Sequence, residues 1–206
     1  MATKYVVQTT VSDHVTVDDQ SLVEGERTAF SRFGFISTQY VDQSTTALAA
    51  TTLAGAANRI ELYPYIPQVS HSIDRISCYV TTGVAAAQVK LVIYDSGTDG
   101  WPDALLYESA ALAAATTNAI AEATMSQAFV AGHIYWLGVR HSSTSTLRAI
   151  ALGAAPSFGT TSTGNAYYTV LRRTLAFATA ATNPWAFLTA DRVAGIAPTA
   201  IKMRIA

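Results

Sequence analysis

A period-two alternation between apolar and other residues runs through the middle of the chain, from residue 71 to residue 153. Within 73–81, Ile76, Cys78 and Val80 fall on one side of an extended backbone, and polar or aromatic residues fall on the other. Similar runs recur about every ten residues, with turn-forming Gly, Pro and Asp between them. This pattern is typical of half-buried strands. We therefore predict an all-β fold, an antiparallel, jelly-roll-like β-sandwich of about eight strands.

The strand expected next along the chain has apolar residues on both sides. Val89, Leu91 and Ile93 are expected to point inward, whereas Val92 and Tyr94 are expected to point outward. Apolar side chains on the outer side indicate that this face is itself covered in part.

Segments outside these runs carry weaker signals. Pro64 and Pro67 predict that the run 59–65 lies at a sheet edge or a strand end. Residues 153–198 are rich in Gly, Asn and Thr, and we expect a long exposed excursion there. The alternating run 199–205 is expected inside a sheet.

The chain divides by composition into two parts. Residues 1–45 are more charged than the rest of the chain, and we interpret them as an N-terminal arm or docking segment. Residues 46–206 are assigned to the β-sandwich domain. The prediction is one sandwich with one arm, which suits a chain of 206 residues.

Charge limits the partners that the chain can have. Charged residues make up 13% of the sequence, against about 25% in a typical soluble domain. A surface so poor in charge is expected to be covered in a homo-oligomer or larger assembly. The net charge is −1 and no basic cluster occurs, so nucleic acid is not an expected partner. Neither a signal peptide nor a membrane-spanning apolar run is expected, which predicts synthesis in a host cytoplasm without membrane insertion.

Residues capable of catalysis are scattered in the sequence. The single cysteine, Cys78, lies on the inner side of a predicted strand and is expected to be a small core residue. The histidines are His14, His71, His133 and His141, and no known catalytic or metal-binding motif contains them. We expect surface or rim positions for them and predict a non-enzymatic protein without a cofactor. The remaining candidates are isolated carboxylates: Glu61, Asp74, Glu108, Glu122 and Asp191.

The clearest loop in the sequence is DSGTDGWPD, which contains Asp95, Asp99 and Asp103 at a spacing of four. A calcium loop of the EF-hand kind needs oxygen ligands at alternating positions and a closing glutamate, which this loop lacks. We predict a turn that aspartate side chains stabilise and no metal, although a calcium site of another kind stays open as an alternative.

Exposed aromatic rings beside polar groups are typical of sugar-binding sites. Trp101 lies in the aspartate-rich loop and is the first candidate, and Tyr167 and Tyr168 in the expected excursion are further ones. The alternative is that such rings pack against the core or a neighbouring subunit, which Trp185 in particular is expected to do. Host surface polysaccharide is thus a candidate ligand for Trp101, Asp95, Asp99, Asp103, Tyr167 and Tyr168.

Several short motifs occur in a fixed order between residues 59 and 206. They are IDRISCYVTT (73–82), IYD (93–95), WPDALL (101–106), AGHIYWL (131–137), LRA (147–149) and IKMR (201–204). In this order they resemble surface proteins of bacteriophages and phage-like particles, of the tail-fibre, head-fibre or decoration type. The resemblance implies a non-enzymatic β-sandwich on a particle and assigns no site residues. Residues 1–45 do not match and would form the particle-specific docking part.

Two functions are expected from these observations. The first is a structural protein of a phage virion, docked by residues 1–45 to other virion proteins, which displays its sandwich and aids host attachment. The resemblance implies a homo-oligomer, with a trimer as the usual choice for fibres. The second is a dedicated receptor- or polysaccharide-binding module that uses the exposed aromatic and aspartate loops.

Overall fold

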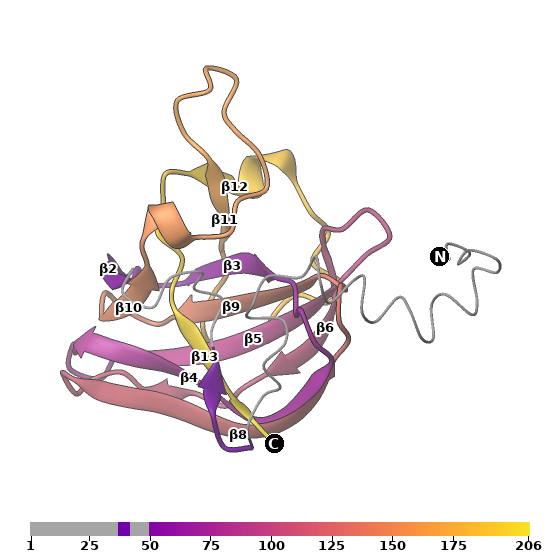
Figure 1. Cartoon of the computed structure of the whole chain (residues 1–206). Helices are drawn as coiled ribbons and strands as arrows, with labels where there is room; N and C mark the ends of the chain where they lie inside the picture. The colour runs from indigo at the N-terminus through magenta and orange to yellow at the C-terminus, as the bar shows by residue number, and fades with distance from the viewer. Residues whose placement is uncertain (1–36, 42–49) are drawn as a thin grey trace, which may run out of the picture. The chain divides into compact units, whose positions relative to one another are not determined.

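Two antiparallel β-sheets face each other in a sandwich (Figure 1). The computed structural model describes residues 37–41 and 50–206. The first sheet, sheet A, has the order β1 (Tyr40–Val41), β13 (Ile201–Ile205), β4 (His71–Thr82), β10 (Thr146–Ile150) and β2 (Ala50–Ala54), and β8 (Ala119–Phe129) also pairs with β4. Sheet B has the order β12 (Arg192–Ala194), β11 (Tyr168–Thr174), β3 (Arg59–Tyr65), β9 (Tyr135–His141), β5 (Gln88–Ser96) and β6 (Pro102–Glu108), and β7 (Leu112–Ala113) pairs with β5.

The chain changes sheet repeatedly. β3 lies in sheet B, β4 in sheet A and β5 in sheet B, and the same alternation continues from β8 to β11. Strands that alternate between two facing sheets are typical of jelly-roll architectures. The predicted all-β, antiparallel sandwich is therefore confirmed. Several of the strands beyond the expected eight are only two or three residues long.

The space between the sheets holds the first core. Ile76, Cys78 and Val80 of β4 are buried there, as their spacing predicts. The backbone N–H of Ile201 in β13 donates a hydrogen bond of 3.1 Å to the Tyr63 hydroxyl of β3, which joins the two sheets directly. Burial raises the pKa of the Cys78 thiol to about 12, so this cysteine is a core residue as expected.

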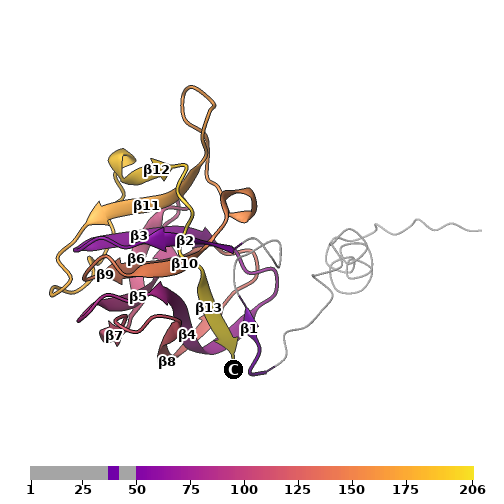
Figure 2. The same ribbon diagram turned by 90° about the vertical axis from the view of Figure 1, so that its left-hand side faces the viewer.

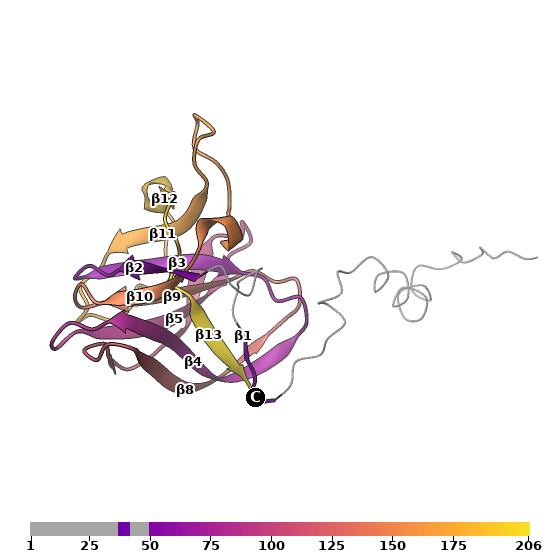
Figure 3. The ribbon, with the colours of Figure 1, turned by 60° about the vertical axis from the view of Figure 1, so that its left-hand side comes forward.

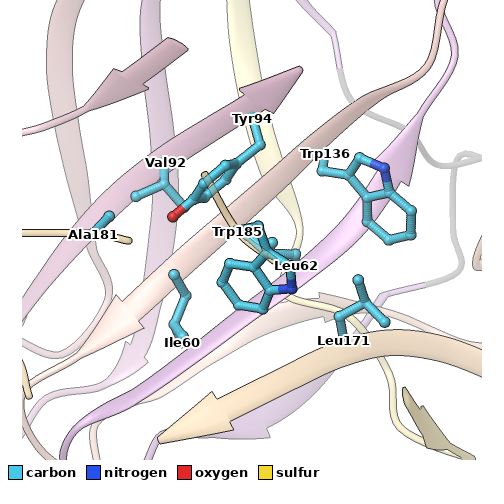
Figure 4. Packing of buried hydrophobic residues seen from close by; sticks show 8 residues of the cluster. All are labelled: Ile60, Leu62, Val92, Tyr94, Trp136, Leu171, Ala181 and Trp185. Atoms are coloured by element: carbon cyan, nitrogen blue, oxygen red, sulfur yellow. The ribbon is translucent and has the colours of Figure 1, made fainter. Parts of the chain in front are cut away.

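A second core covers the other side of sheet B (Figure 4). All seven residues of β9 are buried, so this strand has no solvent-exposed face. Val92 and Tyr94 are fully buried on the outer side of β5, where Tyr94 meets Trp185 edge-on at 5.5 Å. The prediction that this face is covered is confirmed. So is the prediction that Trp185 packs against the core.

The segment that covers this face is residues 175–191, here named the cover segment. It belongs to the region 153–198, for which we predicted a long exposed excursion. That prediction is wrong for most of the region: β11 and β12 are strands of sheet B, and the cover segment packs on the outer face of that sheet. Only the hairpin around residues 159–167 projects from the strands, as the orange loop in Figures 1 to 3.

Arg140 fixes the first half of the cover segment. Its guanidinium is 1% exposed and donates hydrogen bonds to the carbonyls of Ala176 at 2.7 Å and Thr179 at 2.9 Å. It also pairs with Glu108, whose other oxygen accepts a hydrogen bond of 2.9 Å from the Ala181 N–H. A buried charge is tolerable only when it is paired and hydrogen-bonded in this way.

Arg173 fixes the second half of the cover segment. Its guanidinium lies 4.3 Å from the Trp185 ring centre and donates to the carbonyls of Trp185 at 2.9 Å and Ala186 at 3.0 Å. It also forms an ion pair of 2.5 Å with Asp191. One arginine from β11 thus holds both the tryptophan and the end of the segment.

The run 59–65 was expected at a sheet edge or a strand end; the sheet edge is wrong, whereas Pro64 does lie next to the end of the strand. The run forms β3, which pairs with β11 on one side and with β9 on the other. Pro64 pairs with Trp136 of β9, but β11 pairs only as far as Leu62. The proline therefore lies where one side of β3 has no neighbouring strand, which is the usual position for a proline in a sheet.

Most of the predicted arm, residues 1–45, lies outside the described residues. Its described part, residues 37–41, joins sheet A: Tyr40 and Val41 pair with Arg204 and Met203 of β13. Across the described ranges, no helix is long and apolar enough to cross a membrane.

Gly138 supplies a test of the two-sided burial of β9. A Cβ at this position would clash with the Leu62 side chain, the Glu61 carbonyl and the Val92 side chain. We expect Gly138→Ala to lower the free energy of unfolding by about 1–3 kcal/mol in urea denaturation, because the packed neighbours cannot move away. The matched control is Gly153→Ala, where a Cβ meets nothing within 4 Å. Equal stability of the two variants would contradict this packing.

Candidate functional site

The aspartate-rich loop between β5 and β6 is a tight turn. The Gly97 N–H donates to the Trp101 carbonyl at 2.8 Å, and the Asp99 carboxylate accepts from the Trp101 N–H at 3.2 Å. The Asp95 carboxylate accepts from the Ser96 N–H at 2.9 Å and pairs with His133 at 2.5 Å. A turn stabilised by aspartate side chains is therefore confirmed.

The three aspartates do not form a common ligand set. The Asp95 carboxylate pairs with His133, whereas the Asp99 carboxylate accepts from the Trp101 N–H within the turn. Within the described part of the chain, no three His, Cys, Asp or Glu side chains gather as metal ligands would. The geometry of this loop thus gives the calcium alternative no support.

Trp101 lies in an aromatic cluster. Its ring is parallel to Phe187 at 3.9 Å and stacks on Trp136 at 5.9 Å, and Phe158 meets it edge-on at 5.6 Å. A sugar ring needs the flat face of an aromatic side chain, and here neighbouring rings already pack against those faces. A sugar bound at Trp101 would have to contact the edge of the indole or displace Phe187.

Tyr167 and Tyr168 lie at the base of the projecting hairpin rather than at its tip. Tyr167 is 60% exposed and pairs with Thr160 across the hairpin. Tyr168 is half-buried, with the Arg192 guanidinium 4.6 Å from its ring centre and Phe158 stacked on it at 6.4 Å. Phe158 therefore connects Tyr168 to the Trp101 cluster. Of the two tyrosines, Tyr167 is the one whose ring is exposed.

One histidine does not have the surface or rim position that we expected for all of them. His141 is fully buried, and its ring nitrogens have no hydrogen-bond partner among the described residues, so the prediction is wrong there. His71 and His133 are partly exposed, and His14 lies outside the described residues. Burial, with the nearby Arg59 and Arg172, lowers the pKa of His141 to about 3.

The isolated carboxylates each pair with arginine. Their ion pairs are Glu61 with Arg59 and Arg172, Asp74 with Arg204, Glu108 with Arg140, Glu122 with Arg75, and Asp191 with Arg173. Burial raises the pKa of Glu61, against the opposing effect of its two arginines. Through these ion pairs, the carboxylates hold strands and loops together.

A groove on the outer face of sheet A is the site that the sequence reasoning missed. It has a volume of about 240 Å³ and is lined by Tyr40, Ser77, Cys78, Tyr79, Ile120, Arg148, Ala200 and Lys202. These residues come from β1, β4, β8, β10 and β13 and the residue before β13, so the groove exists only once sheet A is assembled. In the sequence, the residues that line the groove cannot be distinguished from residues on the solvent-facing side of ordinary strands.

Strand register explains how this groove forms. Lys202 of β13 lies opposite Ser77 of β4, and Tyr79 of β4 lies opposite Ile120 of β8. Ile120 is 67% exposed, which is unusual for an isoleucine in a paired strand of a sheet. Apolar and cationic side chains therefore lie next to each other on a face that no other described residue covers.

Tyr40 forms one wall of this groove. Its hydroxyl donates a hydrogen bond of 2.5 Å to Glu122 of β8, and Arg75 pairs with the same carboxylate at 2.6 Å. The hydrogen bond to Glu122 raises the pKa of the Tyr40 hydroxyl. A residue of the predicted arm thus helps to build the outer face of sheet A.

Comparison with known proteins assigns no family. No family model matches the chain, and no curated protein matches it. One similar solved structure is described as "Structure of infectious bursal disease virus Gx strain", at 12% identity and a TM-score of 0.30. The match covers 82% of this chain and 36% of that one. A likeness this low carries no conclusion about function.

His141 predicts a pH dependence of stability. Its folded-state pKa of about 3 lies below its ordinary value of 6.5, so the unfolded state binds the proton more tightly. Stability from this residue is complete above pH 6.5 and falls as the pH drops toward 3, by up to about 1.4 kcal/mol per pH unit. Urea denaturation at pH values from about 4 to about 7, roughly the span of this effect, gives the free energy of unfolding as a function of pH. A plot of this free energy against pH should have a shallower slope for His141→Gln than for the wild type. His133→Gln, at a partly exposed site, is the matched control, and an unchanged slope for His141→Gln would refute the assignment.

Proposed function

We propose that this chain is a non-enzymatic structural protein of a phage virion, docked through its N-terminal segment and displaying the β-sandwich on the particle. The resemblance of residues 59–206 to phage surface proteins motivates the phage assignment. In this proposal the sandwich aids host attachment on a tail, fibre or head, and its partners are other virion proteins and further copies of itself, such as a trimer.

One observation carries the docking part of this proposal. Two described residues of the predicted arm, 1–45, pair with β13: the Thr38 N–H donates to the Ile205 carbonyl, and the Ile205 N–H donates to the Gln39 carbonyl, each at 2.8 Å. An arm attached to a particle would therefore hold the sandwich through a β-ladder as well as through a covalent connection.

Cross-linking of intact particles tests this proposal. An amine-reactive cross-linker is expected to join Lys4 of the predicted arm to another virion protein in purified particles. Lys90 is the matched control, because it pairs with Glu108 at 3.6 Å within sheet B. Absence of the chain from particles, or links from Lys4 only within the same chain, would refute it.

A polysaccharide-binding module is the second candidate, and the exposure of Tyr167 favours it. A glycan array should then show at least a tenfold weaker signal for Tyr167→Ala, because an exposed ring is lost without a core contact. Trp101→Ala should lower both the glycan signal and the melting temperature, because Trp101 packs against Phe187 and Trp136. No binding by the wild type, or unchanged binding by Tyr167→Ala, would remove this surface from consideration.

A further inference from the structure

We propose that the groove on the outer face of sheet A binds a carboxylate-bearing sugar, such as one uronic acid unit of an acidic polysaccharide. The groove is separate from the aspartate-rich loop and from the hairpin with Tyr167. Its function depends neither on the docking of the arm to a particle nor on glycan contact at those loops.

The groove contains uncompensated positive charge. Among the described lysines and arginines, only Arg148, Arg192 and Lys202 form no ion pair with another described residue. Two of these three, Arg148 and Lys202, line the same groove. Two unpaired cations at one site repel each other, and a bound anion removes that repulsion.

The strand register brings these two cations together. The Ala200 N–H donates to the Arg148 carbonyl at 2.9 Å, and Lys202 is two residues further along, on the same face of sheet A. The Arg148 guanidinium lies 4.7 Å from the centre of the Tyr79 ring. Stacking on a ring leaves the N–H groups of a guanidinium directed outward in its plane, where they match the two oxygens of a carboxylate.

The carboxylate of Glu122 does not fill this role. It belongs to the same face, where it lies opposite Ser77 across the β4–β8 pair. However, Arg75 and the Tyr40 hydroxyl already hold its two oxygens, at 2.6 and 2.5 Å. Arg204, the remaining cation of this face, is held in turn by Asp74. The charges around the groove are thus neutralised in pairs, and those within it are not.

The rest of the lining decides which anion fits. Tyr40 is 42% exposed and Ile120 is 67% exposed, so the groove presents apolar surface beside its cations. Inorganic phosphate has no apolar face to place against these side chains. A pyranose ring with a carboxylate has both an anionic group and an apolar C–H face, and the Ser77 hydroxyl can pair with a ring hydroxyl. A volume of about 240 Å³ suits one such ring rather than a longer segment.

Isothermal titration of the full chain tests this site with four probes. They are a galacturonate tetramer, a neutral galactose tetramer, inorganic phosphate and a short polyglutamate peptide. We expect binding of the galacturonate tetramer, at least tenfold weaker binding of each of the others, and a loss of affinity as salt is raised. If polyglutamate binds as tightly as the galacturonate tetramer, the groove recognises charge or an acidic protein segment. If phosphate binds as tightly, the groove recognises an anion alone. Either result would overturn the proposal.

Matched substitutions locate the binding. The double variant Arg148→Gln and Lys202→Gln should weaken galacturonate binding at least tenfold. The melting temperature should fall only slightly, because the stack of Arg148 on Tyr79 is lost but neither side chain is in an ion pair with a described residue. Arg192→Gln removes the third such cation, which lies over Tyr168 outside the groove, and should leave binding unchanged. Absence of galacturonate binding by the wild type, or an equal loss in both variants, would also overturn the proposal. None of these outcomes depends on incorporation into particles, so this site and the docking proposal can fail separately.

Discussion

Burial of the central strands of sheet B on both faces is the constraint on which the rest of this structure depends. A strand such as β9, with every residue buried, needs one apolar layer from sheet A and another from elsewhere in the chain. The cover segment provides the second layer, but it contains no strand of its own that could pair with the sheet. Two arginines, Arg140 and Arg173, supply the missing hydrogen bonds by donating to its backbone carbonyls. Ionic contacts thus position an apolar layer that ordinary strand pairing does not hold.

The sequence predicts the inner faces well and the outer faces poorly. Period-two alternation identifies Ile76, Cys78 and Val80 because strand geometry alone decides which side they share. Outward Val92 and Tyr94 indicate a covered face but not what covers it, since the covering residues lie far along the chain and show no regular period. The burial of His141 is equally invisible, because a histidine at a strand end is normally accessible. Long-range pairing with Arg59 of β3 and Val89 of β5, together with the close approach of residue 55, encloses it.

The groove on sheet A shows the same limit for function. Each of its residues alone is an ordinary member of a solvent-facing row, so no local motif marks it. What distinguishes Arg148 and Lys202 is the absence of a described carboxylate beside them, while Arg75 and Arg204 on the same face have one. Such a distinction exists only after the register of β4, β8, β10 and β13 is fixed. The aspartate-rich loop, by contrast, stands out in the sequence because turn chemistry is local, and its main contacts are structural.

The lone thiol has a practical consequence. Cys78 is the only cysteine of the chain, it lies between the sheets, and its pKa of about 12 keeps it protonated at neutral pH. Its side chain is 2% exposed, so a thiol reagent can reach it only when the strands around it move apart, and the rate of labelling reports how often the sandwich opens. The chain therefore carries a single-site reporter of its own opening motions.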